Sequence, residues 1–320
     1  MRKVCYFALF IFLMISLVWA NPSFAQRKFL TLASGSPGGV YYPLGGGMAV
    51  VIQKTTDLRC AAESTGASVE NCRLVGAGES DMGMVMGSIA YKATEGEKPF
   101  EQKLPLVALF QLYPAPEHIV TVSGKGIRSI KDLKGKKVSI DVPGSGCAVM
   151  AQAMLQEYGF DLQKDLTIAH LSQNESAQAL KDGIVDAVFF NFAYPAAAVL
   201  DLAATRDIVM VPMEPTMLEK MLKKYPYYVM SVIPARTYPK VDYDVLCLGD
   251  SNVLVANQNM EEGVAYKIVK AIFENVDKGQ WALKNIHPIA GQFTPQNAIH
   301  SPIDLHPGAV KYFKEVGAIK

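Results

Sequence analysis

Two glycine-rich turns stand where helices are expected to begin, and their residue types could bind a ligand. The first covers residues 35–39, before a predicted helix at Tyr41–Lys54, and the second covers residues 143–146, before a predicted helix at Ala148–Tyr158. Free backbone N–H groups and the positive end of the helix dipole bind anions at such places. Glycine also lets a ligand approach the backbone closely. The two turns therefore favour a carboxylate or phosphate ligand.

Two further segments supply candidate ligand-binding residues. Residues 63–71 place hydroxyl groups between a predicted strand and a helix, where capping of the helix explains them equally well. Residues 189–195 place an asparagine at the carboxyl end of a predicted strand, where α/β folds bind their ligands. Together the four segments give the predicted binding residues Gly39, Val40, Tyr41, Thr65, Ser68, Gly144, Ser145, Gly146, Cys147, Asn191 and Tyr194.

Motifs for nucleotide binding and for catalysis are missing from the sequence. Val149 stands where a G-x-G-x-x-G turn beginning at Gly144 needs its third glycine, and there is neither a P-loop nor a G-x-S-x-G nucleophile turn. Cys147 opens a predicted helix, whose dipole would lower the pKa of its thiol, but no histidine base lies nearby in the sequence. We therefore predict no catalytic residue, and an enzyme that uses Cys147 or Ser145 is the weakest alternative.

Cysteines and histidines predict neither a metal site nor a disulfide framework. No cysteine pair has C-x-x-C spacing, and the five histidines form no H-x-x-x-H or H-E-x-x-H pair. We therefore predict no metal and no cofactor. Cys60 and Cys72 are close enough in sequence to form a disulfide, but four buried or half-buried thiols after residue 25 are the favoured interpretation, and the pairing is left open.

Charge and the N-terminal segment restrict the cellular role. The 31 Lys+Arg and 30 Asp+Glu residues give a net charge of +1, which lacks the basic excess that a nucleic-acid backbone requires. Residues 1–25 combine Arg2 and Lys3 with an apolar run and the small residues of Ser23-Phe24-Ala25, which predicts a signal peptide cleaved after Ala25. The run is short for a membrane anchor of about 20 residues, so we expect an exported, periplasmic protein that does not bind nucleic acid.

From Phe29 onward, short runs rich in β-branched residues alternate with helical patterns, which predicts an α/β fold with a mostly parallel sheet. The proline-rich residues 113–116 are expected to separate two strands. An amphipathic helix over 261–276 and a last helix over 307–316 are expected to return to the first half of the chain.

This return predicts two discontinuous lobes. Lobe 1 comprises residues 26–113 and 247–320, lobe 2 comprises residues 120–240, and residues 114–119 and 241–246 are the hinge crossings. Hinged lobes of this kind close on a ligand and bury it between them.

Six strings of the sequence resemble the TAXI family, the substrate-binding subunits of TRAP-type secondary transporters. They run in order over almost the whole chain after the predicted signal peptide. The strings are SGSPGGVYYPLGGGMA, AESTGASVENCRLV, DLKGKKVSIDVPGSG, SAQALKDGIVDAVFF, IPARTYP and PIDLHPGAVKYFKEVG.

The resemblance implies a two-lobe periplasmic binding-protein fold, type II-like, that binds glutamate, 2-oxoglutarate or a related dicarboxylate and delivers it to integral-membrane TRAP permease subunits. We expect a monomer. The family's motifs fall on Gly38–Tyr41, Glu63–Ser68 and Pro143–Gly146, while Cys147 and Val40 stand where threonine is usual. Residues 192–195 also replace a stretch that usually contains glycine. The alternative function is a periplasmic sensor that presents the bound acid to a membrane receptor.

Overall fold

The computed structural model of the protein describes residues 29–37 and 39–320. The predicted signal peptide and Gly38 of the first glycine-rich turn lie outside the described residues. Within those two ranges, no helix is both long enough and apolar enough to cross a membrane. Helices and strands alternate along most of the chain, so the α/β fold class predicted from the sequence is confirmed.

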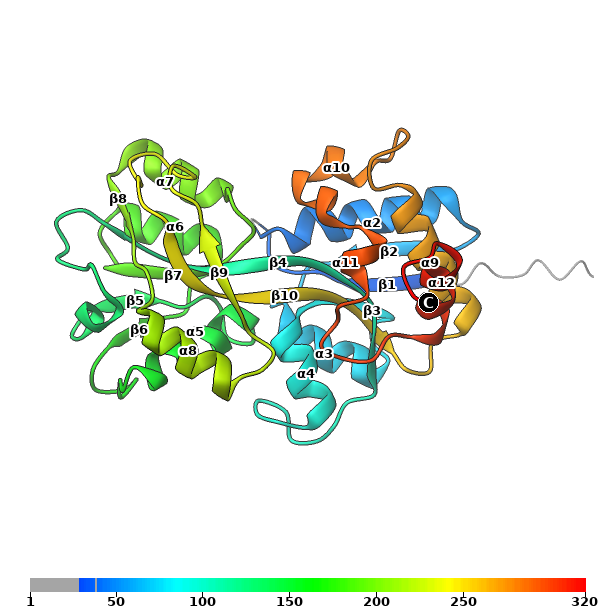
Figure 1. The fold of residues 1–320 in the computed structure, drawn as a ribbon, viewed down its shortest axis with the longest axis horizontal. Helices are drawn as coiled ribbons and strands as arrows, with labels where there is room; N and C mark the ends of the chain where they lie inside the picture. Colours follow the sequence, from blue (N-terminus) through cyan, green and yellow to red (C-terminus); the bar gives the residue numbers. More distant parts are fainter. Residues whose placement is uncertain (1–28, 38) are drawn as a thin grey trace, which may run out of the picture.

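Three parallel strands form one end of the molecule (Figure 1). Strand β1 (Phe29–Ala33) lies between β2 (Arg59–Glu63) and β3 (Met82–Met86) and pairs with both. Every residue of β3 is buried, as expected for a strand covered on both faces. Three helices of this end follow its strands in the chain: α2 (Tyr41–Thr55), α3 (Ser68–Ala77) and α4 (Gly87–Glu95). Gly78 and Gly96 end α3 and α4 in the left-handed conformation that glycine favours.

A second set of parallel strands forms the other end. Strand β5 (Lys137–Ser139) lies between β6 (Thr167–Ala169) and β7 (Ala187–Asn191). The helices of this end are α5 (Gly146–Glu157), α6 (Gln173–Lys181), α7 (Ala197–Thr205) and α8 (Pro215–Lys224), with a short 3-10 turn, η1 (Ile130–Leu133). The strand–turn–helix order of the first end therefore recurs here.

Two long antiparallel strands join the two ends. Strand β4 (Leu106–Val122) and strand β10 (Val245–Asn257) pair from Leu106↔Asn257 to Pro116↔Gly249. Over the same stretch, β10 also pairs with β3. Towards the other end of the molecule, β10 pairs with β9 (Val229–Ile233), while β4 pairs with β7 and with β8 (Ile208–Met210). Figure 1 shows the two strands crossing between the two groups of helices. The strands of the described residues thereby belong to one connected sheet.

The break predicted at residues 113–116 is wrong, because β4 runs through them as one strand. Proline fits the extended backbone and lacks only the N–H donor. Two side-chain amides donate to the carbonyl groups beside the prolines: Asn252 to Tyr113 O and Asn191 to Ala115 O, each at 3.0 Å. These bonds give both carbonyl groups a hydrogen-bond donor where the backbone hydrogen bonds between the strands are incomplete.

The predicted parallel character of the sheet is also wrong, because the sheet is mixed. Parallel pairs occur within each end, whereas β4 and β10 run antiparallel to their neighbours. Alternation of strands and helices predicts the pairing within each set but does not state how the two sets connect. The sequence patterns also left several elements without a prediction: α8, β9, α10 (Leu283–Ile286), η2 (Pro288–Gln292) and α11 (Pro295–Ala298).

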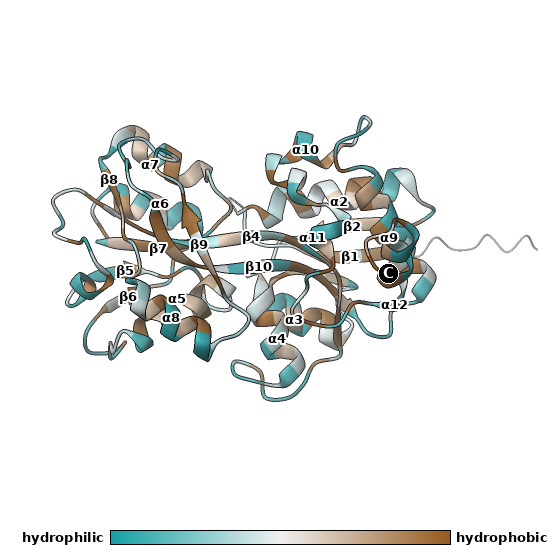
Figure 2. Ribbon diagram, viewed as in Figure 1, coloured by the Kyte–Doolittle hydropathy of each residue, from teal (hydrophilic) through white to brown (hydrophobic). Residues whose placement is uncertain are grey.

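The C-terminal helices pack on the first end of the molecule. Helix α9 (Glu262–Glu274) contributes Ile268 and Ile272, and α12 (Pro307–Glu315) contributes Phe313, to one core with Leu30 and other residues of the first sheet. Figure 2 shows hydrophobic residues along the strands and hydrophilic residues on the outer turns of these helices. The chain therefore returns to its first half after β10, while the exact limits of the predicted lobes stay a prediction.

The close contact between α9 and α12 gives a test of this packing. A Cβ atom at Gly308 would lie 2.8 Å from the backbone nitrogen of Tyr266 and would also clash with the carbonyl oxygen of Glu262. We therefore expect Gly308→Ala to lower the free energy of unfolding by about 1–3 kcal/mol, measured by urea denaturation. Gly263→Ala in α9 is the matched control, since no atom lies within 4 Å of the position that its new methyl group would take. Equal stability of the two variants would contradict this packing.

Candidate functional site

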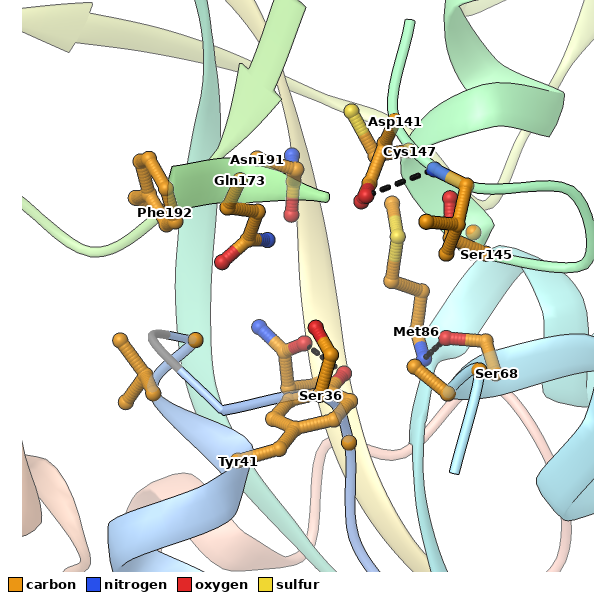
Figure 3. Close-up of a pocket in the computed structure, with 18 of the residues that line it drawn as sticks. Ser36, Tyr41, Ser68, Met86, Asp141, Ser145, Cys147, Gln173, Asn191 and Phe192 are labelled. Carbon is orange, nitrogen blue, oxygen red and sulfur yellow. Dashed lines mark hydrogen bonds between the residues drawn. The ribbon is translucent and has the colours of Figure 1, made fainter. Parts of the chain in front are cut away.

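A cavity of about 520 Å³, counted out to the solvent at its mouth, lies between the two ends of the molecule (Figure 3). Both glycine-rich turns contribute to its walls, so segments about 100 residues apart in sequence meet there. The lining residues are Gly35, Ser36, Gly39, Val40, Tyr41, Gly66, Ala67, Ser68, Met86, Tyr113, Asp141, Val142, Ser145, Gly146, Cys147, Gln173, Asn191, Phe192 and Asn252.

Hydrogen bonds fix the wall from the first end of the molecule. The Tyr41 hydroxyl donates to the Asn252 side-chain oxygen, which joins the start of α2 to β10. Burial raises the pKa of Tyr41, with smaller contributions from Tyr113 and Asp250, so the hydroxyl stays neutral. The Ser68 hydroxyl oxygen accepts the backbone N–H of Met86 at 3.0 Å, which ties the start of α3 to the end of β3.

The start of α5 forms the opposite wall. The Ser145 hydroxyl oxygen accepts the N–H of Ala148 at 3.0 Å and so caps the helix. The N–H groups of Gly146 and Cys147 have no acceptor among the residues that the structure describes. Unpaired N–H groups at the positive end of a twelve-residue helix attract a negatively charged group. The geometry therefore presents two free N–H donors at one corner of the cavity.

Asp141 lies beside this corner, at the end of β5. Its side chain lines the cavity, although only 5% of the residue is exposed, and its backbone adopts a φ of 73°. Burial raises the pKa of Asp141 to about 6, and hydrogen bonds from Val142 N–H, Ser145 and Gln173 limit this rise. The carboxyl group is therefore mostly ionised at neutral pH, and it places a negative charge in the wall.

A second carboxyl group, Glu117, lies behind the cavity wall. Asn191 donates to Glu117 Oε2 at 3.2 Å, and the Cys147 thiol donates to Glu117 Oε1 at 3.6 Å. Burial raises the pKa of Glu117 to about 8, despite these hydrogen bonds, so this group is mostly protonated at neutral pH. Glu117 positions two lining residues without adding a charge.

The expectation that the helix dipole lowers the pKa of Cys147 is wrong. Burial, together with the neighbouring Glu117 and Asp141, raises the pKa of this thiol. A protonated thiol is a poor nucleophile, which agrees with the absence of a catalytic role in the prediction. The described cysteines are Cys60, Cys72, Cys147 and Cys247, and all four are buried and free, so Cys60 and Cys72 do not form a disulfide. No cluster of metal-binding side chains occurs in residues 29–37 and 39–320.

The structure brings most of the predicted binding residues together. The cavity is lined by Gly39, Val40, Tyr41, Ser68, Ser145, Gly146, Cys147 and Asn191. Whether these residues contact a ligand stays a prediction.

Three predicted residues do not line the cavity. The Thr65 hydroxyl donates to Asn71 Oδ1 at 2.6 Å, so it stabilises the local turn. Gly144 adopts a φ of 86° in the second turn, and Tyr194 is 39% exposed. For these three residues, the sequence pattern identified a segment that contributes to the cavity wall. It did not predict that the residue itself lies outside the lining.

Several lining residues were missed by the sequence patterns. Asp141 is the polar last residue of an apolar strand pattern over residues 138–141, and this position at the carboxyl end of a strand could have identified it. Tyr113 and Asn252 lie in the middle of β4 and β10, where only the strand register brings them to the cavity. Gln173 follows the Ser172 cap of α6, which the sequence analysis did not place near a ligand.

Contacts across the cavity hold the two walls together. The backbone N–H of Val69, at the start of α3, donates to the carbonyl oxygen of Gly144 at 3.0 Å. On the other side, a Cβ atom at Gly39 would lie 2.9 Å from Gln173 Oε1, so the absence of a side chain permits this approach. The structure thus shows the two ends in contact on both sides of the cavity.

Comparison with known proteins gives a family and a fold. Residues 32–317 match the sequence model of the NMT1-like family. The malate-bound protein MatC from Rhodopseudomonas palustris is 13% identical, with a TM-score of 0.58 and coverage of 92% of this chain and 98% of MatC. The periplasmic binding protein BugD is 11% identical, with a TM-score of 0.57 and coverage of 91% and 94%.

A third similar structure is PhnD1 from Prochlorococcus marinus in complex with methylphosphonate. It is 14% identical, with a TM-score of 0.54 and coverage of 91% of this chain and 97% of PhnD1. At identities of 11–14%, these three structures show that the chain shares their fold. The similarity extends over both ends of the molecule.

Glu117 gives a test of the electrostatics behind the cavity wall. Its pKa is raised from 4.5 to about 8, so its contribution to stability is complete below pH 4.5 and is lost as the pH rises through 8. We expect Glu117→Gln, which resembles the protonated acid, to gain a few kcal/mol over the parent protein between pH 5 and pH 8, at about 1.4 kcal/mol per pKa unit. Urea unfolding at both pH values measures this gain.

The control for this experiment is Glu219→Gln, which removes an exposed carboxyl group from α8. It should show the same pH dependence as the parent protein. An unchanged pH dependence in Glu117→Gln would mean that Glu117 is already ionised in the folded protein.

Proposed function

Because the chain belongs to the NMT1-like family, we propose that it is an exported substrate-binding protein that captures a small organic acid and delivers it to a membrane permease. The TAXI resemblance supports a TRAP-type permease as the partner and the periplasm as the location. In this proposal, the lobes formed by residues 26–113 with 247–320 and by residues 120–240 close on the acid.

The observation that carries this proposal is the cavity with walls from both ends of the molecule. A ligand in it would contact α2 and α3 on one side and α5 on the other, so it would bind both lobes at once. A solute that bridges two lobes favours their closed arrangement by its differential affinity for that state.

An acid group of the ligand is proposed to bind at the start of α5. The N–H groups of Gly146 and Cys147 have no acceptor among the described residues and would donate to a carboxylate. Ser145 would keep these groups in place by capping the helix. MatC holds malate and PhnD1 holds methylphosphonate, so acids bind to proteins of this fold.

A ligand panel tests the proposed function directly. The chain from Gln26 would be purified, stripped of ligand by mild denaturation and refolding, and unfolded thermally with amino acids, keto acids, dicarboxylates and aromatic acids. A ligand at 100 times its Kd should stabilise the protein by about 2.7 kcal/mol and raise the Tm by several degrees. No shift with any acid would contradict the proposal.

Ser36 gives a test of the location of the site. Its side chain points into the cavity from the loop between β1 and α2, as Figure 3 shows. We expect Ser36→Trp to fill the cavity and to weaken binding of the acid found in the panel by at least tenfold, measured by calorimetry. Ser36→Ala, which leaves the space open, should retain most of the affinity. Full affinity in Ser36→Trp would mean that the acid binds elsewhere.

A further inference from the structure

The cavity holds an excess of negative charge. Asp141 is the only ionisable carboxylic acid among the described lining residues, and no lysine, arginine or histidine occurs among them. A ligand with negative charge alone would therefore meet the Asp141 carboxylate in a buried place without a side-chain cation to balance it. Burial of unbalanced charge is strongly unfavourable. This charge pattern points to a ligand that also carries a cationic group.

Unpartnered acceptors add a second, independent observation. Gln173 Oε1 is buried and has no hydrogen-bond partner among the described residues. Figure 3 shows the side-chain oxygens of Gln173 and Asn191 directed into the cavity, while the Asn191 nitrogen is used by Ala115 O and Glu117. Because amide oxygens only accept hydrogen bonds, they call for N–H or O–H donors on the ligand.

The acceptor and donor groups lie side by side. Asp141 precedes Gly146 by one short turn, and Figure 3 shows the Asp141 carboxylate next to Cys147 and Ser145. The corner therefore presents a carboxylate and two unpaired N–H groups at neighbouring positions. An α-amino acid carries its ammonium and carboxylate groups on one carbon atom, so its head group has the same adjacent pattern with the opposite charges.

We propose that the cavity binds an α-amino acid, whose ammonium group donates to Asp141 and to Gln173 Oε1 and whose carboxylate accepts from the N–H groups of Gly146 and Cys147. This inference rests on the proposed function and narrows the organic acids to those that carry an ammonium group. Keto acids and simple dicarboxylates are disfavoured, whereas glutamate remains compatible.

The neighbouring carboxyl group does not compete for this role. Glu117 does not line the cavity, and its oxygens accept from Asn191 and Cys147. Because burial raises its pKa to about 8, it is mostly neutral at neutral pH. Asp141 is therefore the group whose charge selects the ligand.

Matched pairs of solutes test the inference with the unmodified protein. L-Glutamate would be compared with 2-oxoglutarate, and L-leucine with 4-methyl-2-oxopentanoate, by isothermal titration calorimetry at pH 7.5. Within each pair the carbon skeleton and the carboxylates are the same, and a carbonyl oxygen replaces the ammonium group and the α-hydrogen. We therefore expect the amino acid of at least one pair to bind at least ten times more tightly than its keto acid. Equal or tighter binding of the keto acids would overturn the ammonium site and leave the proposed function intact.

Asp141→Asn tests the residue itself. Asparagine tolerates the positive φ of 73° at this position, so the backbone can keep its conformation. We expect the variant to lose at least tenfold in affinity for the amino acid and to bind the keto acid as tightly as the parent protein or more tightly, because the repelling charge is gone. The matched control is Asp182→Asn, which removes an exposed carboxylate directly after the last residue of α6, at the end of the helix opposite to Gln173. This change should leave both affinities unchanged.

The outcomes separate the two proposals. Unchanged amino-acid affinity in Asp141→Asn would overturn the role of Asp141. If the variant does not fold, Gln173→Met removes the second acceptor, and it should weaken binding of the amino acid several-fold. Failure of every acid in the pairs and in the larger panel to bind the parent protein would overturn the proposed function as well.

Discussion

The antiparallel pairing of β4 with β10 is the interaction on which the arrangement of the whole molecule depends. One set of parallel strands attaches to β10 through β3, and the other attaches to β4 through β7. Since no other strand pairing links the two sets within the described residues, a bend in these two strands would move one end relative to the other. Tyr113 and Asn252 lie in this stretch and also line the cavity. Ligand contacts and the junction between the ends therefore share residues.

Local signals in the sequence located much of the cavity wall. Glycine at the start of a helix has a direct physical reason, so the turns before α2 and α5 were correctly identified as parts of one region. The alternation of short apolar runs with helical patterns was predictable because a short apolar run between turn residues leaves few alternatives to a buried strand, and β1 and β3 are strands of this kind. Features of this kind depend on residues near one another in the chain.

Features that depend on distant residues were not predictable in this way. The continuity of β4 through residues 113–116 requires the Asn191 and Asn252 amides, which come from β7 and β10. Likewise, the burial that raises the pKa of Glu117 arises from packing of several elements around it. The mixed sheet has the same origin, because strand direction between the two sets is decided by the crossings and not by either set alone.

The Cys147 thiol is hydrogen-bonded behind the cavity wall, so access to it depends on opening of that wall. The side chain is 3% exposed, and its Sγ atom contacts Glu117 and the carbonyl oxygen of Phe189 behind the wall. A reagent can reach a buried thiol only through transient local opening of the structure. The rate at which Cys147 reacts with such a reagent therefore measures how often this wall opens, and no added probe is needed.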